Sequence, residues 1–196
     1  SLKKGINEKF NLDFPSPYGC SKGAADQYVN DYSRIYNIDG YVLRQSCIYG
    51  TNQFGIEDQG WVSWFIIASI LRKKFKVYGD GKQVRDILYI DDLNKLYYKI
   101  ALNKKKLNTN RIFNVGGGHK FSLSLLELFK ILKKECGLRL DYSFHSERKG
   151  DQKIFISDNS KISKTFNWSP QIDPIKGTKN LIKWVMNNKK KISSII

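Results

Sequence analysis

Helical and strand patterns alternate along this chain, and no other feature of the sequence restricts its fold as strongly. Apolar residues at helical spacing are followed by short apolar runs that are bounded by glycine. Such alternation is typical of α/β proteins, in which helices cover a mostly parallel sheet. With 196 residues, the chain is long enough to bury a substantial core. We therefore expect an α/β fold.

The expected elements follow from periodicity and from turn residues. Helices are predicted over residues 17–36, 59–74, 91–104, 124–137, 159–168 and 175–190. Strands are predicted over 40–50, 111–118, 138–145 and 153–158, and two more within 75–90 that are joined by a turn at Asp80-Gly81. Ser124 and Glu127 have capping-box spacing, and Gly137 is expected to stop the same helix.

The charge of the chain is strongly positive, with 34 Lys and Arg against 18 Asp and Glu, a formal net charge of +16. An anionic partner would explain this excess: a nucleic acid, a phosphorylated metabolite or a membrane surface. A lysine-rich solvated surface explains it as well, and the sequence has no arginine-rich segment interleaved with aromatic residues. For that reason we do not expect nucleic acid as a partner. We do not expect a membrane either, because no apolar run reaches the roughly 18 residues of a membrane span.

Cysteine usage also limits the class of protein. The three cysteines, Cys20, Cys47 and Cys136, are widely spaced and odd in number. This pattern favours free thiols in a reducing compartment over a disulfide framework or a zinc site. We expect a cytoplasmic protein without a bound metal.

Tyr18 and Lys22 lie four residues apart at the start of the first predicted helix, directly after Pro17. Residues at this spacing share one face of a helix. An ammonium group next to a phenol favours the phenolate, which is the form that accepts a proton. The pair therefore predicts a proton-transfer device next to a positively charged cofactor, although an ordinary surface pair on a helix has the same spacing.

Three consecutive glycines, Gly116 to Gly118, follow a predicted strand. A dinucleotide-binding turn requires G-x-G-x-x-G, and Phe121 stands where the third glycine would be. We interpret this segment as a strand-to-helix turn rather than as a cofactor cradle.

Five segments in order resemble the extended short-chain dehydrogenase/reductases, the NAD-dependent epimerase/dehydratase family. The segment SPYGCSKGAADQYV resembles the active-site helix of that family, and LRQSCIYG resembles its Arg-x-x-Asn-Val-Tyr-Gly strand. VYGDGKQVRDILYIDD, FNVGGG with SLLEL, and SERKGDQKIFISDNSKISKTFNWSP resemble the three segments that follow. The resemblance covers essentially the whole chain. It implies a Rossmann-type, doubly wound parallel sheet with a smaller α/β substrate-binding domain.

The resemblance also implies a reaction. Members of this family bind NAD and act on nucleotide-diphosphate sugars. This sequence is most similar to those members that invert C2 of a CDP-linked dideoxyhexose by transient oxidation. A 4-epimerase or a 4,6-dehydratase of the same superfamily stays open. From another class, a non-catalytic polyanion-binding module also stays open, because of the net charge of +16.

Roles for individual residues are implied by their places in these motifs. Tyr18 would be the catalytic base, Lys22 would hold the nicotinamide ribose, and Gln45 would lie near the nicotinamide. The substrate-binding residues would be Gln53, Gln59, Trp61, Tyr78, Arg85, Arg148 and Asp151. Within this set the two arginines would clamp the diphosphate, Asp151 would bind the ribose and Tyr78 would face the base. Cys47 departs from the family pattern, which has asparagine there.

The position of Tyr18 so close to residue 1 implies that the glycine-rich NAD cradle of the family lies outside this chain. We expect residues 1–50 to be the last part of an NAD-binding domain. Residues 51–196 are expected to form a mixed substrate-binding domain, with some strands and helices that return to the Rossmann sheet. We expect the chain alone to be inactive and to self-associate through an apolar strand edge near residues 41–48. The whole protein is expected to be a homo-oligomer.

Overall fold

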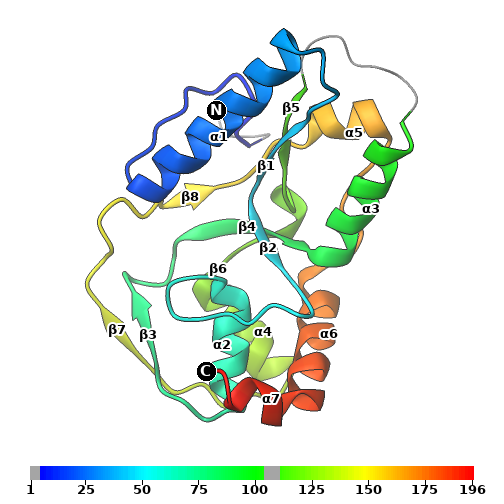
Figure 1. Ribbon diagram of the computed structural model, residues 1–196. Coiled ribbons are helices and arrows are strands. Elements are labelled where there is room, and N and C mark those ends of the chain that lie inside the picture. The colour runs from blue at the N-terminus through cyan, green and yellow to red at the C-terminus, as the bar shows by residue number, and fades with distance from the viewer. Residues whose placement is uncertain (1–4, 104–110) are drawn as a thin grey trace.

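The computed structural model describes residues 5–103 and 111–196. The elements follow the order α1 (Pro17–Ile35), β1 (Val42–Gln45), β2 (Cys47–Tyr49), α2 (Trp61–Ile70), β3 (Phe75–Tyr78), β4 (Val84–Tyr89), α3 (Ile90–Ala101) and β5 (Ile112–Val115), then the short 3-10 helix η2 (His119–Phe121), β6 (Ser122–Ser124), α4 (Leu125–Lys134), β7 (Tyr142–His145), β8 (Ile154–Phe155), α5 (Ser160–Phe166), α6 (Pro174–Asn187) and α7 (Lys189–Ser193). In Figure 1, α1, β1, β5, α3 and α5 form the upper part, and α2, α4, α6, α7, β3 and β7 form the lower part.

Most strand pairs in the described residues are parallel, which confirms the predicted α/β class. β1 pairs with β5, β2 with β4, and β3 with β7, all in parallel. β4 also pairs with β8 in parallel and with β6 antiparallel. The strand β4 therefore holds three neighbours, and it lies between the upper and lower parts of the molecule (Figure 1).

The strand predicted over residues 40–50 is divided in two at Ser46. The Ser46 amide donates to the Val115 carbonyl, while its hydroxyl donates to Oδ1 of Asp86 at 2.5 Å. Ser46 thus moves the chain from β5 to β4 as its neighbour. Because periodicity alone does not reveal a change of partner, the sequence predicted one strand.

The two strands predicted within 75–90 exist and a turn joins them, but they do not pair with each other as a hairpin. β3 pairs with β7 and not with β4. Gly79 and Gly81 both have positive φ, at 78° and 74°, so the turn chemistry is present. The turn directs β4 into the central sheet, where it pairs in parallel with β2 and β8 and antiparallel with β6.

Two hydrophobic clusters lie on opposite sides of β4. The larger one gathers residues of α2, α4 and α6 together with Ile87 and Tyr89 of β4. The smaller one gathers residues of α3, β5 and α5 together with Leu88. Successive side chains of a strand point to opposite faces, so β4 contributes to both clusters.

The glycine turn after β5 is a packing feature, as predicted. A Cβ atom on Gly116 would lie 2.1 Å from Oδ2 of Asp86 and 2.2 Å from Oγ of Ser157. Asp86 is fully buried and also accepts a hydrogen bond of 2.9 Å from the Gly118 amide. The turn lacks side chains because it closes around this buried carboxylate.

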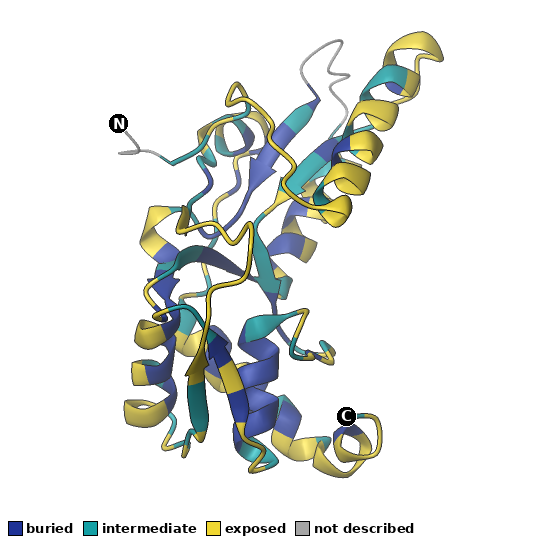
Figure 2. Cartoon of the chain, turned by 90° about the vertical axis from the view of Figure 1, so that its left-hand side faces the viewer, coloured by how far each residue is buried: buried dark blue, intermediate teal, exposed yellow. Residues whose placement is uncertain are grey.

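Local sequence explains why α1 begins before Tyr18. Ser16 is the N-cap, and its Oγ accepts a hydrogen bond of 3.0 Å from the Gly19 amide. Pro17 at the first helical position has no amide to satisfy there. Most of α1 is exposed, as the yellow helix in Figure 2 shows.

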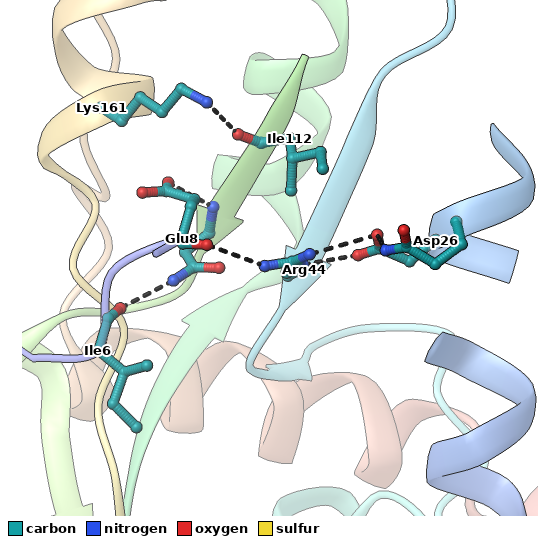
Figure 3. A network of polar contacts seen from close by, with 8 residues as sticks. Ile6, Glu8, Asp26, Arg44, Ile112 and Lys161 are labelled. Carbon is teal, nitrogen blue, oxygen red and sulfur yellow. Dashed lines mark hydrogen bonds and ion pairs between the residues drawn. The ribbon is translucent and has the colours of Figure 1, made fainter. Parts of the chain in front are cut away.

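Arg44 of β1 fastens α1 to the sheet. Its Nε and Nη2 atoms lie 2.6 Å and 3.2 Å from the two carboxylate oxygens of Asp26, and its Nη1 donates to the Glu8 carbonyl at 3.3 Å. Figure 3 shows Arg44 between Asp26 and the N-terminal segment. Glu8 in turn accepts from the Asn114 amide of β5. This network fixes the orientation of the helix that carries Tyr18.

Candidate active site

A cavity of about 490 Å³ opens where α1, the loop before α2 and the strands β2, β3 and β4 meet the loop between β7 and β8. Seven of the predicted site residues line it: Tyr18, Gln59, Trp61, Tyr78, Arg85, Arg148 and Asp151. These residues come from five separate stretches of the chain. We call this cavity the cleft.

Tyr18 and Lys22 lie side by side at the rim of the cleft. The Lys22 ammonium lies 5.5 Å from the centroid of the Tyr18 ring. The Tyr18 side chain is exposed, and its backbone carbonyl accepts from the Ser21 hydroxyl. The phenol is therefore accessible to a ligand, and the Lys22 ammonium lies beside its ring.

Arg85 lies deeper in the cleft and is mostly buried. Its Nη2 lies 2.7 Å from Oδ1 of Asp151, and its Nη1 donates to the Val84 carbonyl. The pair joins β4 to the loop after β7. A guanidinium held in this way keeps further donors for phosphate oxygens.

Arg148 lies across the face of Tyr78. Its guanidinium carbon is 4.0 Å from the ring centroid, and its Nη2 lies 2.8 Å from Oδ1 of Asp58. The Tyr78 hydroxyl donates to Oε1 of Glu57 at 2.7 Å. Tyr78 and Arg148 are thus each held by a carboxylate of the loop before α2.

Cys47 lines the inner wall of the cleft beside Trp61. The Trp61 indole Nε1 donates to the Cys47 sulfur at 3.3 Å. Burial raises the pKa of the Cys47 thiol, and the Trp61 hydrogen bond offsets part of this effect. The thiol here serves as an acceptor for Trp61, which the sequence could not indicate.

Three predicted residues do not line the cleft. Lys22 lies beside Tyr18, as described above. Gln45 is exposed at the end of β1, where its amide donates to the Tyr97 hydroxyl at 2.6 Å. Gln53 accepts from the Ser63 hydroxyl, donates to the Ile48 carbonyl and lines a different cavity, together with Asp91.

The two carboxylates before Gln59 that line the cleft, Glu57 and Asp58, were missed from the sequence. Both lie between the predicted residues Gln53 and Gln59. Two adjacent carboxylates in a chain of net charge +16 were the signal that could have identified them as site residues.

The comparison with family models decides how this geometry is interpreted. Residues 4–116 match the model described as "NAD dependent epimerase/dehydratase family". The chain belongs to this family. The family is NAD-dependent, and the matched region includes Tyr18, Lys22, Tyr78 and Arg85.

Curated relatives in the family are similar over nearly the whole chain. A CDP-paratose 2-epimerase of Salmonella typhi is 43% identical over 92% of this chain and 54% of its own length. A putative UDP-glucose 4-epimerase of Methanocaldococcus jannaschii is 34% identical over 93% of this chain and 57% of its own. The chain therefore spans a little over half the length of these two relatives.

Solved structures of the epimerase/dehydratase family share the fold. A UDP-glucuronic acid 4-epimerase of Bacillus cereus, in complex with UDP-glucuronic acid and NAD, superposes with a TM-score of 0.82 at 26% identity. The superposition covers 93% of this chain and 56% of that one. In the described residues, 5–103 and 111–196, we find no helix long and apolar enough to cross a membrane.

Proposed function

We propose that this chain is part of an NAD-dependent nucleotide-sugar epimerase that inverts C2 of CDP-paratose to give CDP-tyvelose. One observation carries the proposal. Tyr18, with Lys22 beside it, lines the same cleft as Arg85 and Arg148, and the volume of this cleft is about 490 Å³. One ligand in the cleft can therefore contact a proton acceptor and two guanidinium groups. The 43% identity to a CDP-paratose 2-epimerase supports this particular reaction within the family.

The cleft suits a nucleotide-diphosphate sugar. Arg85 and Arg148 are both paired with carboxylates, and a diphosphate would replace those carboxylates with more strongly charged oxygens. When Arg148 turns to the diphosphate, it leaves the face of Tyr78, which is then open to a base. Asp151, freed from Arg85, becomes an acceptor for a ribose hydroxyl.

Tyr18 and Lys22 fit the reactive end of NAD. Both are exposed at the cleft rim and share one helix face, so they can reach the same ligand. When bound, NAD supplies reversible hydride acceptance. Tyr18 removes the proton from the C2 hydroxyl when hydride leaves C2, and returns it to the same oxygen when hydride is returned to the opposite face of C2. Lys22 holds the nicotinamide ribose, and Gln59 and Trp61 bound the space for the sugar.

We propose the same division of the chain that the motifs suggest. Residues 1–50 would be the last part of an NAD-binding domain. Residues 51–196 would form the substrate-binding domain, apart from strands and helices that return to the NAD-binding sheet, such as β5 beside β1. Homo-oligomerisation is part of this proposal, because α1 and its C-cap residue expose the large side chains Tyr28, Val29, Tyr32, Ile35 and Tyr36. Sedimentation of the whole protein across a concentration series tests the homo-oligomer, and a monomer at every concentration would contradict it.

The activity test requires the part of the relatives' length that lies outside this chain. We would co-express the chain with the N-terminal part of the Salmonella relative, add CDP-paratose, and follow the C2 proton by NMR. Formation of CDP-tyvelose is expected. Turnover of UDP-glucose or dTDP-glucose instead would favour the 4-epimerase or the 4,6-dehydratase.

A further inference from the structure

The loop before α2 ends in a tight turn over residues 56–59, which we call the acidic turn. The Ile56 amide donates to the Gln59 carbonyl at 2.9 Å, and the Gln59 amide donates back to the Ile56 carbonyl at 3.1 Å. Glu57 and Asp58 are the two residues at its tip, and both line the cleft. The two reciprocal hydrogen bonds fix this backbone, so both carboxylates are presented from a defined position.

The two carboxylates have different partners. Asp58 pairs with Arg148 and is largely exposed. Glu57 accepts from the Tyr78 hydroxyl at 2.7 Å through Oε1, with the Lys76 ammonium 3.8 Å from the same atom. In the described residues no hydrogen bond to Oε2 of Glu57 is found. This oxygen is an available acceptor on the carboxylate that accepts from the Tyr78 hydroxyl.

The proposed function places a pyrimidine base on the face of Tyr78, and the inference below rests on that function. Bases stack on aromatic rings whatever their identity, so the ring alone does not discriminate between them. The edges of the bases do differ. Cytosine presents an amino group, a donor, at the position where uracil presents a carbonyl, an acceptor.

We infer that Glu57 determines the base, by accepting a hydrogen bond from the exocyclic amino group of cytosine and rejecting the carbonyl of uracil. An ionised carboxylate can only accept hydrogen bonds. With uracil, the Glu57 carboxylate and the base carbonyl would both be acceptors, with no proton between them. A site that desolvates a polar group without a partner loses affinity. Glu57 therefore makes the cleft selective for CDP-linked over UDP-linked sugars.

The alternative to base selection by Glu57 is a purely structural role, and the experiment must distinguish the two. Glu57 could act only by holding the Tyr78 hydroxyl, in which case its loss would weaken every stacked base alike. The two roles differ in the ratio of affinities for CDP and UDP. That ratio, rather than either affinity, is therefore the quantity to measure.

Calorimetric titration with CDP and with UDP measures the two affinities and their ratio. The wild-type chain, Glu57→Gln and Asp58→Asn are compared. The wild type is expected to prefer CDP, and Glu57→Gln to reduce this preference about tenfold or more, because an amide can donate to the uracil carbonyl. Asp58→Asn is the matched control, one residue away on the same turn. It is expected to change both affinities by the same factor.

A second variant isolates Glu57 from Tyr78. Tyr78→Phe removes the phenol hydroxyl but keeps the ring and the carboxylate, so the preference for CDP is expected to persist. Loss of the preference in this variant, or an unchanged ratio in Glu57→Gln, would overturn the role of Glu57. Equal wild-type affinity for the two nucleotides would overturn only this inference, whereas no binding of either would overturn the proposed function with it.

Discussion

The guanidinium carbon of Arg148 lies 4.0 Å from the centroid of the Tyr78 ring, and the same guanidinium is paired with Asp58 on the acidic turn. The side chains of Arg148 and Asp58 are 39% and 81% exposed, so solvent screens the pair. Exposed pairs contribute little to stability. Arg148 therefore covers the ring through a contact that a diphosphate can replace at low cost.

Asp58→Asn is expected to raise the affinity for CDP and UDP together. The variant removes the carboxylate that competes with the ligand for Arg148. An exposed pair contributes about 1 kcal/mol or less, so the gain is at most about fivefold. Calorimetry measures it, and weaker binding in this variant would show that Asp58 itself contacts the ligand.

Arg85→Ala and Arg148→Ala are expected to weaken CDP binding by about tenfold or more, because each removes a charge-assisted hydrogen bond to phosphate. NAD binding should change far less. Arg139→Ala is the control, since Arg139 is exposed and lines a separate cavity. Equal losses of CDP and NAD affinity would mean that the two arginines do not face the nucleotide sugar.

Tyr18→Phe is expected to reduce epimerase turnover by about 10²-fold or more in the co-expressed protein, because the proton acceptor is lost while the ring is kept. CDP affinity should be nearly unchanged. Tyr28→Phe, which alters another exposed tyrosine of α1, should turn over normally. Turnover by Tyr18→Phe at the wild-type rate would exclude Tyr18 as the base.

Arg44→Met is expected to lower the free energy of unfolding by about 2 kcal/mol. The side chains of Arg44 and Asp26 are 20% and 9% exposed, so the variant leaves a carboxylate buried without its cation. Arg34→Met breaks the exposed pair with Asp31 and should cost below about 0.5 kcal/mol. Urea denaturation measures both, and equal costs would contradict the anchoring role of Arg44.

The capping box of α4 gives a pH dependence. Hydrogen bonds from the Ser124 amide and hydroxyl hold the pKa of Glu127 below its ordinary value of 4.5. Because the folded-state pKa is the lower one, this contribution to stability is present above the unfolded-state value and is lost as the pH falls through the folded one. Glu127→Gln should therefore be less stable than the wild type at pH 7, and the difference should shrink on acidification. A constant difference from pH 7 to pH 3 would contradict this.

Local chemistry in the sequence was enough to place most elements. The Ser124–Glu127 capping box is present as predicted, and Pro17 starts α1. What failed was partner choice. Nothing near Asp80-Gly81 indicates that β3 pairs with residues 142–145, because that pairing joins positions far apart in the sequence.

The candidate site was predicted through motifs, and the cleft brings most of those residues together. Glu57 and Asp58 were missed because their importance lies in contacts with Tyr78 and Arg148, about 20 and 90 residues away. The position of Cys47 was noticed as a departure, but its bond to Trp61 was not predictable. Such contacts depend on the tertiary structure, which a single sequence does not reveal.

The placement of β4 between the two hydrophobic clusters has a consequence for how the molecule comes apart. Ile87 and Tyr89 are buried on one side of this strand and Leu88 on the other. The amide hydrogens of β4 can exchange with solvent only when neighbouring strands separate, and both clusters resist that separation. Heating should therefore melt the upper and lower parts in a single cooperative transition, with β4 the last segment to exchange its hydrogens.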